Sequence, residues 1–172
     1  MLNIDQLEAL AERVKGLTDS DREVDALVTL ALLARPTANP RIATLIAQPS
    51  QPVCMFWDQS FKDHMVKRLE QQAKDYDEDL IYFEYDEKWL HFVTRTVPYF
   101  TSDIDAGLAN LPAGFSKWKM DSSGAATLWN EDARKNILFE NTIPAISLTG
   151  AILKAKIFLL RDLNEREPEA RN

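Results

Sequence analysis

The sequence predicts an α+β fold in which helices and a small, mainly antiparallel sheet alternate along the chain. Two observations carry this prediction. Apolar residues recur at helical spacing near both ends of the chain, whereas short apolar runs in the middle come in pairs separated by polar turns. With 172 residues, of which 45% are hydrophobic and 27% charged, the chain has the length and composition of one ordinary globular domain.

The first two helices are predicted from capping signals. Asn3 with Gln6 three residues later forms a capping box. The apolar residues that follow share one helical face and end at Gly16: Leu7, Leu10, Ala11 and Val14. Ser20 and Glu23 form a second capping box, and the nearly all-apolar stretch from 24 to 34 predicts a buried helix.

The middle of the chain predicts a surface helix followed by a hairpin. A short helix is a hypothesis for residues 41–47, and the apolar run 53–57 fits either a strand or the entry to a helix. Apolar residues at four-residue intervals predict a helix from Phe61 to about Asp75. Residues 81–85 and 89–94 read as two strands joined by a polar turn.

The last third of the chain predicts a helix, two strands and a closing helix. Ser102 and Asp105 open a short helix through Asn110 as another capping box. Two strands, 115–120 and 125–129, flank a turn in which Gly124 supplies the positive φ.

A final helix with a broad apolar face follows an irregular stretch. Thr142 can cap it, and Pro144 stands near its first turn, where the missing N–H costs least. We therefore expect a single domain over residues 1–163, with an acidic insert at about 58–87 and a mobile polar tail over 164–172.

Three blocks of the chain resemble one family of small phage and prophage proteins, the phage ABA sandwich domain. They are residues 7–14 with 21–27, residues 98–115, and residues 142–155. The middle block is the most specific, because Ser-Asp-Ile-Asp-Ala followed by Leu-Pro-Ala-Gly-Phe is an unusual combination. The blocks occur in the family's order and cover about half of the chain.

This resemblance implies a layered α/β/α sandwich, with the sheet between helices, in agreement with the order of elements given above. Two departures matter. Phe115 stands where the family commonly has tryptophan, and the segment 37–94 is longer or different from the family pattern. The family's members are largely uncharacterised, so the resemblance indicates a phage or prophage accessory protein and supplies no catalytic residue.

Charge and cysteine content bear on the class of partner and on the cellular compartment. The net charge of −7 argues against general nucleic-acid binding, and −6 of it falls in residues 58–87, which hold ten acidic and four basic residues. The single cysteine, Cys54, rules out an intramolecular disulfide and favours a reducing compartment. The N-terminus has no secretory pattern, and the apolar stretch 143–160 contains two lysines. We expect a cytoplasmic protein without a membrane partner, in the host cytoplasm if it is phage-encoded.

No metal site or cofactor is expected. The spacing Asp75-x-Asp77-x-Asp79 opens like an EF-hand calcium loop, but its sixth position is Leu80 and its twelfth is Asp86. Calcium loops need glycine and a bidentate glutamate at these two places, so the pattern favours an acidic turn.

No catalytic residue is assigned either. Two pairs could order a proton-transfer site: Asp58 with His64 on one helix, and Glu84 with His91 across the hairpin. Each pair is more typical of an ordinary surface or cross-strand polar contact. Asp103 and Asp105 suit the first turn of a helix, where the helix dipole favours negative charge. A hydrolase is therefore the weakest alternative.

An aromatic pocket is the stronger alternative. Tyr82, Tyr85 and Trp89, beside Arg95 and the helix start at Ser102, would hold a planar, anionic, nucleotide-like molecule if one face of the hairpin is exposed. The opposing interpretation, which we weigh higher, is a sheet packed between helices on both faces.

The leading prediction is non-catalytic binding to a host or phage protein through an acidic surface, because such surfaces dock on basic patches. The candidate contact residues all belong to the acidic segment: Asp75, Asp77, Glu78, Asp79, Asp86 and Glu87.

Overall fold

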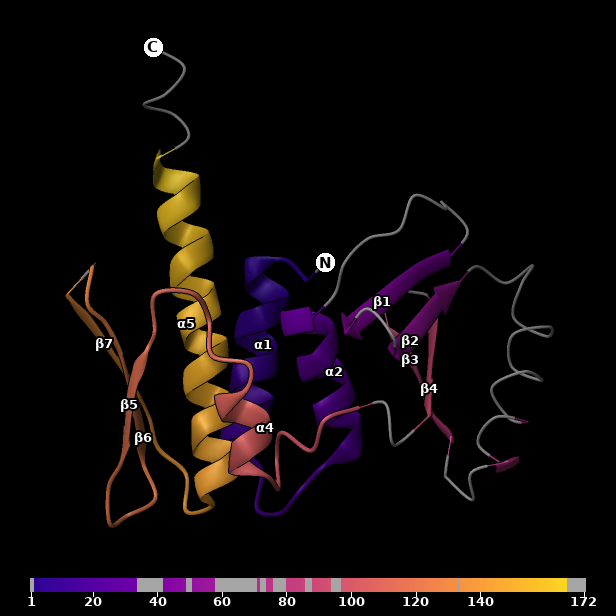
Figure 1. The fold of residues 1–172 in the computed structure, drawn as a ribbon, viewed down its shortest axis with the longest axis horizontal. Helices are drawn as coiled ribbons and strands as arrows, with labels where there is room; N and C mark the ends of the chain where they lie inside the picture. Colours follow the sequence, from indigo (N-terminus) through magenta and orange to yellow (C-terminus); the bar gives the residue numbers. More distant parts are fainter. Residues whose placement is uncertain are drawn as a thin grey trace. The chain divides into compact units, whose positions relative to one another are not determined.

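The computed structural model describes residues 2–33, 42–48, 51–57, 71, 74–75, 80–85, 88–93, 97–132 and 134–166 (Figure 1). The chain groups into two compact units. The three-stranded unit combines Leu2–Asp21 with Tyr99–Asn172, and the four-stranded unit spans Arg22–Pro98. Each unit contains helix and antiparallel sheet, so the predicted α+β fold class is confirmed. The single domain over residues 1–163 stays a prediction.

The three-stranded unit is organised around its long C-terminal helix. Its elements are α1 (Ile4–Lys15), α4 (Ile104–Leu108), β5 (Lys117–Met120), β6 (Ala126–Asn130), β7 (Lys135–Phe139) and α5 (Pro144–Arg166). Helix α5 contacts α1, α4, β6 and β7, and it lies between α1 and the sheet (Figure 1). Its middle is almost fully buried because it packs on neighbours from several directions.

Helix α1 forms as its capping signals predict. The Asn3 side chain accepts a hydrogen bond from the Gln6 backbone N–H (2.8 Å), and the Gln6 side chain accepts one from the Asn3 N–H (2.9 Å). The predicted apolar face is the buried one, and Gly16 ends the helix. The capping box and apolar spacing are both local signals, so they can be recognised without knowledge of the fold.

The three-stranded sheet has the order β5-β6-β7, with both pairings antiparallel. Ala126 pairs with Phe139 and Leu128 with Ile137, and these four buried residues form the face that meets α5. Strand β7 falls in the stretch expected to be irregular. Gly150 of α5 allows the close approach, because a Cβ at this position would overlap the Phe139 ring.

The hairpin of β5 and β6 contains the turn predicted at residues 121–124. Gly124 adopts a φ of +91°. The Asp121 carboxylate accepts hydrogen bonds from the Ser123 hydroxyl (2.6 Å), the Ser123 backbone N–H (2.8 Å) and the Ala125 N–H (3.1 Å). These bonds hold the pKa of Asp121 below its ordinary value, the Ser123 hydroxyl contributing most.

Replacing Ser123 with alanine is expected to raise the pKa of Asp121 toward its ordinary value, as measured by NMR titration of the carboxyl carbon. Since the folded-state pKa is depressed, the turn's contribution to stability is present above the unfolded-state pKa and is lost as pH falls through the folded-state pKa. Ser122→Ala in the same turn is the control and leaves the pKa unchanged. An unchanged pKa in Ser123→Ala contradicts the assigned cause.

The two remaining helix starts differ in how well they were predicted. Asp103, not Ser102, caps α4, because its carboxylate accepts the Asp105 N–H (2.9 Å), so the capping box at Ser102 is wrong. Helix α5 begins at Pro144, close to the predicted start, but the cap predicted at Thr142 is wrong, because the Asn141 side chain accepts the Ile143 N–H (2.9 Å). It continues to Arg166 and so includes the first residues of the predicted tail; residues 167–172 lie outside the described part.

The four-stranded unit contains one described long helix and a meandering sheet. Its elements are α2 (Arg22–Leu33), β1 (Ile42–Gln48), β2 (Gln51–Trp57), β3 (Leu80–Tyr85) and β4 (Lys88–Val93). The strand order is β1-β2-β4-β3, and every neighbouring pair is antiparallel. The hairpin predicted from residues 81–94 is confirmed as β3 and β4, and the ambiguous run at 53–57 is a strand.

The helix hypothesised at residues 41–47 is wrong, because Ile42–Gln48 forms strand β1 and pairs with β2. The β-branched residues Ile42, Thr44 and Ile46 alternate along it, a pattern that favours a strand once a partner is present. Of the helix expected up to Asp75, the described residues Gln71, Lys74 and Asp75 are helical.

Candidate functional site

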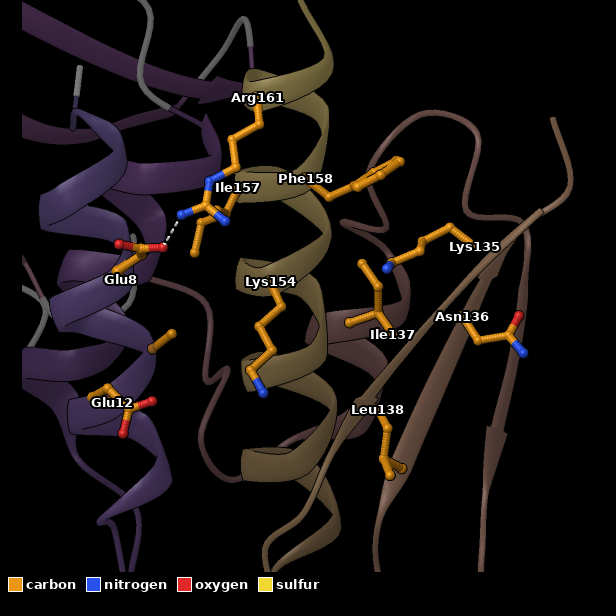
Figure 2. A pocket seen from close by; sticks show the side chains of 11 residues that line it. Glu8, Glu12, Lys135, Asn136, Ile137, Leu138, Lys154, Ile157, Phe158 and Arg161 are labelled. Atoms are coloured by element: carbon orange, nitrogen blue, oxygen red, sulfur yellow. Dashed lines mark hydrogen bonds and ion pairs between the residues drawn. The ribbon is translucent and has the colours of Figure 1, made fainter. Parts of the chain in front are cut away.

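The three-stranded unit contains a groove with a volume of about 610 Å³ (Figure 2). Its lining comes from three elements: Glu8, Ala11 and Glu12 from α1, residues 135–138 from β7, and Lys154, Ile157, Phe158 and Arg161 from α5. Helix α5 forms the floor, and α1 and β7 form the two walls. We call this the α5 groove.

The spacing of the lining residues follows from their secondary structure. Positions 154, 157, 158 and 161 are three or four residues apart and therefore form one stripe on α5. Glu8 and Glu12 are four residues apart on α1, beside the buried face that packs against α5. The α1–α5 contact thus brings residues from opposite ends of the chain to one groove.

The β7 wall reaches the edge of the sheet. Four consecutive β7 residues line the groove, although successive residues of a strand point to opposite faces. A cavity that contacts β7 residues from both faces of the sheet must run along the edge of the strand. Strand β7 is the last strand of β5-β6-β7, so among the described strands only β6 pairs with it. Alternate backbone N–H and C=O groups of β7 therefore point away from β6, toward the groove.

The middle of the groove is apolar. Ile137 and Ile157 are buried, and Phe158 is half-buried with its ring edge-on to Phe115 at a centroid distance of 6.3 Å. Leu138 is 49% exposed on the β7 wall. By strand alternation Leu138 belongs to the sheet face away from α5, so it offers apolar contact area at the β7 edge, whereas Phe158 offers it on the floor.

Charged side chains surround this apolar part. Arg161 forms an ion pair with Glu8 across the end of the groove (Figure 2). Lys154 lies over the Phe139 ring, with Nζ 5.0 Å from the centroid, which is a cation–π contact. Lys135 begins β7 and points toward α5, whereas Asn136 points away from it (Figure 2). Two cations therefore stand along the β7 side of the groove.

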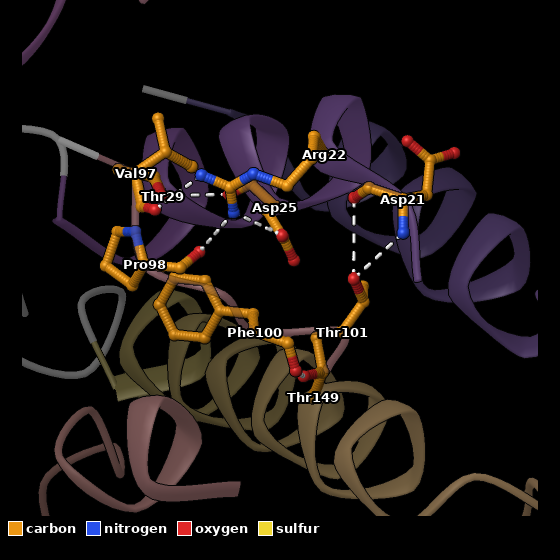
Figure 3. A network of polar contacts seen from close by, with 9 residues as sticks. All are labelled: Asp21, Arg22, Asp25, Thr29, Val97, Pro98, Phe100, Thr101 and Thr149. Carbon is orange, nitrogen blue, oxygen red and sulfur yellow. Dashed lines mark hydrogen bonds and ion pairs between the residues drawn. The ribbon is translucent and has the colours of Figure 1, made fainter. Parts of the chain in front are cut away.

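A second polar cluster lies in the four-stranded unit, around Arg22 (Figure 3). The guanidinium donates to the Asp25 carboxylate (2.5 Å) and to the carbonyl oxygens of Val97 (2.7 Å) and Pro98 (3.2 Å). Asp25 is fully buried, and the Thr29 hydroxyl donates to the Asp25 carbonyl (2.8 Å). Because Arg22 binds backbone carbonyls, the cluster ties residues 97–98 to α2 and has a structural role.

The residues proposed for an aromatic pocket do not all fall on one sheet face. Tyr82 pairs with His91, and Trp89 pairs with Glu84, so positions 82 and 89 share a face by strand alternation, whereas position 85 belongs to the other face. Arg95 lies outside the described residues. Ser102 is exposed and belongs to the three-stranded unit. The nucleotide-like ligand stays a prediction from the sequence.

Most of the acidic segment lies outside the described residues, including Asp77, Glu78, Asp79, Asp86 and Glu87. Asp75 is described: it is helical and exposed, and its carboxylate accepts a hydrogen bond from the Gln71 side chain (2.6 Å). The partner-binding role of these six residues stays a prediction.

Of the two proposed catalytic pairs, the described residues include only Glu84 and His91, on neighbouring strands. Glu84 pairs with Trp89 and His91 with Tyr82, so Glu84 and His91 are diagonal neighbours on one sheet face and do not stand directly opposite each other. Asp58 and His64 lie outside the described residues. In the part of the chain that is described, no three His, Cys, Asp or Glu side chains gather closely enough to hold a metal ion. The described helices include none with the length and apolarity needed to span a membrane.

Comparison with protein-family models, with curated proteins and with solved structures found no match to this chain. The resemblance to phage ABA sandwich domains therefore stays a prediction from the sequence. The case for a function depends on the geometry of the α5 groove.

The α5 groove was not predicted from the sequence. Residues 135–139 were assigned to no strand, and the two lysines of the stretch 143–160 were considered only as interruptions of an apolar run. A signal was available in the helical stripe of Lys154, Ile157, Phe158 and Arg161, which mixes charged and apolar residues on one side of an otherwise buried helix.

Proposed function

We propose that this protein binds another protein non-catalytically, by holding an extended segment of its partner in the α5 groove. One observation carries the proposal: the edge strand β7 borders a groove whose floor is the partly apolar stripe of α5. An extended peptide can add to such an edge as a fourth strand, with backbone hydrogen bonds giving affinity and side-chain contacts giving specificity.

The dimensions of the groove fit this use. Its volume of about 610 Å³ lies within the usual range of ligand sites, roughly 300–1,000 Å³. Strand β7 has five residues, so an added strand of similar length can form a few backbone hydrogen bonds, each worth about 0.5–1.5 kcal/mol net. Contact with Leu138 and Phe158 adds apolar burial. These terms support micromolar rather than very tight binding.

The resemblance to phage ABA sandwich domains supports an accessory role during phage or prophage life, with a host or phage protein as the partner. The acidic segment 58–87 supports a second contact, with a basic surface on that partner.

Replacing Leu138 with glutamate is expected to weaken peptide binding at least about tenfold, because it places an unpaired charge on the apolar wall. The probes are peptides selected from a random decapeptide library on the full chain, with Kd measured by calorimetry. Leu163→Glu is the matched control, since Leu163 is 58% exposed on α5 and does not line the groove. Equal weakening in both variants, or no selected peptide, would overturn the proposal.

Backbone hydrogen bonds between β7 and a bound peptide can be tested separately by N-methylation of the peptide. Every second residue of an added strand directs its N–H toward β7, so N-methylation of one alternate set in a selected peptide abolishes binding and N-methylation of the other set does not. Amide hydrogen exchange should slow at those alternate residues of 135–139 whose N–H groups point away from β6. Equal effects of both N-methylated sets contradict strand addition.

A further inference from the structure

We infer that the α5 groove selects partner segments with the pattern acid-x-apolar-x-acid. This inference rests on the proposed function, because it assumes a strand added to β7. The side chains that line the groove then determine which side chains of the added strand fit.

Alternation along β7 sets the pattern. Residues 135, 137 and 139 share the face toward α5, as their pairing with Asn130, Leu128 and Ala126 shows. A strand paired with β7 places its own alternate residues beside these three, because paired residues of neighbouring strands share a face. The partner's α5-facing residues therefore meet three successive environments along the groove.

These three environments are a cation, an apolar site and a second cation. Lys135 stands at the first position. Ile137, with Ile157 and Phe158 on the floor, forms the second. Lys154 lies over Phe139 at the third. A carboxylate, an apolar side chain and another carboxylate complement them in this order, and the pattern fits a strand of either direction because it is symmetric.

The carboxylates of the groove do not cancel this preference. Glu8 is held in its ion pair with Arg161, and Glu12 belongs to α1, the wall opposite β7. An added strand lies about 4.8 Å from β7 and so reaches Lys135 and Lys154 before it reaches α1. Two cations thus face the nearest side of the partner strand.

The test compares two capped heptapeptides with identical flanks, one with the core Asp-Thr-Leu-Thr-Asp and one with the core Lys-Thr-Leu-Thr-Lys. The full-length protein is expected to bind the acidic peptide at least about fivefold more tightly, with the difference shrinking as salt is raised. Lys154→Glu should lower that preference to about one or reverse it. Lys119→Glu is the matched control, since it changes the net charge equally from β5, outside the groove.

The outcomes separate the two ideas. If library peptides bind in a Leu138-dependent manner but neither they nor the heptapeptides show an acidic preference, the pattern is wrong and the proposed function stands. If Lys119→Glu changes the preference as much as Lys154→Glu, the effect is one of net charge and the pattern is again wrong. If no peptide binds in a Leu138-dependent manner, both ideas fail.

Discussion

Replacing Gly150 with alanine is expected to lower the free energy of unfolding by about 2 kcal/mol, although alanine is the better helix former. In a helix interior the substitution would normally gain about 1 kcal/mol. At this position the new Cβ would overlap the ring of Phe139, which is buried and fixed in β7. Overpacking of this kind costs about 3 kcal/mol, so the steric effect outweighs the helix propensity. Urea-induced unfolding of the full chain measures the difference.

Gly16 provides the matched control. It ends α1 with a φ of −80°, and a Cβ there would meet only the backbone oxygens of Arg13 and Glu12, at 3.6 and 3.9 Å. Gly16→Ala is therefore expected to change stability by less than about 0.5 kcal/mol. Similar losses in the two variants would contradict the role assigned to the contact between Gly150 and Phe139.

A second substitution tests the partner of Gly150 directly. Phe139→Leu alone leaves a cavity, but in combination with Gly150→Ala it makes room for the added methyl group. The double variant is therefore expected to be more stable than the sum of the two single effects, by about 1 kcal/mol of coupling energy. Strict additivity would show that the two residues do not oppose each other.

Replacing Asp25 with asparagine is expected to destabilise the four-stranded unit by about 3 kcal/mol. Asp25 is fully buried, and its carboxylate accepts a 2.5 Å charge-assisted hydrogen bond from Arg22, whose side chain is 25% exposed. Removing the negative charge leaves the arginine charge largely buried, and breaking a buried pair in this way costs about 3–5 kcal/mol. Part of the cost is offset because the asparagine oxygen can still accept a hydrogen bond. Urea unfolding and hydrogen exchange of the α2 amides measure the loss.

The exposed pair Arg13–Asp21 supplies the comparison. Its side chains are 40% and 30% exposed and 3.2 Å apart, so water screens the interaction. Asp21→Asn removes the same charge and keeps a side chain of the same shape, and it is expected to cost less than about 1 kcal/mol. Comparable losses at the two positions would show that burial does not set the strength of the Arg22–Asp25 pair.

The elements that the sequence predicts correctly are those with local signals. The capping box of α1, the start of α5 at Pro144 and the turn at Gly124 each depend on residues within a few positions of one another. The hairpin of β3 and β4 was recognised for the same reason, since only two residues of sequence separate its strands.

The elements that were missed depend on distant partners. A short helix was hypothesised for residues 41–47, and residues 135–139 were assigned to no element. Residues 42–48 and 135–139 are strands, because a neighbouring strand satisfies their backbone groups. The cap of α4 shifted by one residue, from Ser102 to Asp103, since either side chain can accept the first free N–H.

The stripe on α5 is visible in the sequence, but the walls that make it a groove are not, because α1, β7 and α5 are separated along the chain. Glu8 and Arg161 form an ion pair although 153 positions separate them, and Lys154 meets Phe139 across the junction of helix and strand. Nothing in either local sequence indicates these contacts. They follow from the packing of α5 against both α1 and the sheet.

The amino-acid sequence by itself determined the α+β class, the capping box and apolar face of α1, and the concentration of negative charge in residues 58–87, because each depends on composition or on short-range spacing. Only the tertiary structure decided that α5 lies between α1 and the sheet, that β7 is an edge strand, and that cations and apolar side chains meet beside that edge. The physical reason is that burial and strand pairing join residues far apart in the chain, and the α5 groove exists only where those long-range contacts form.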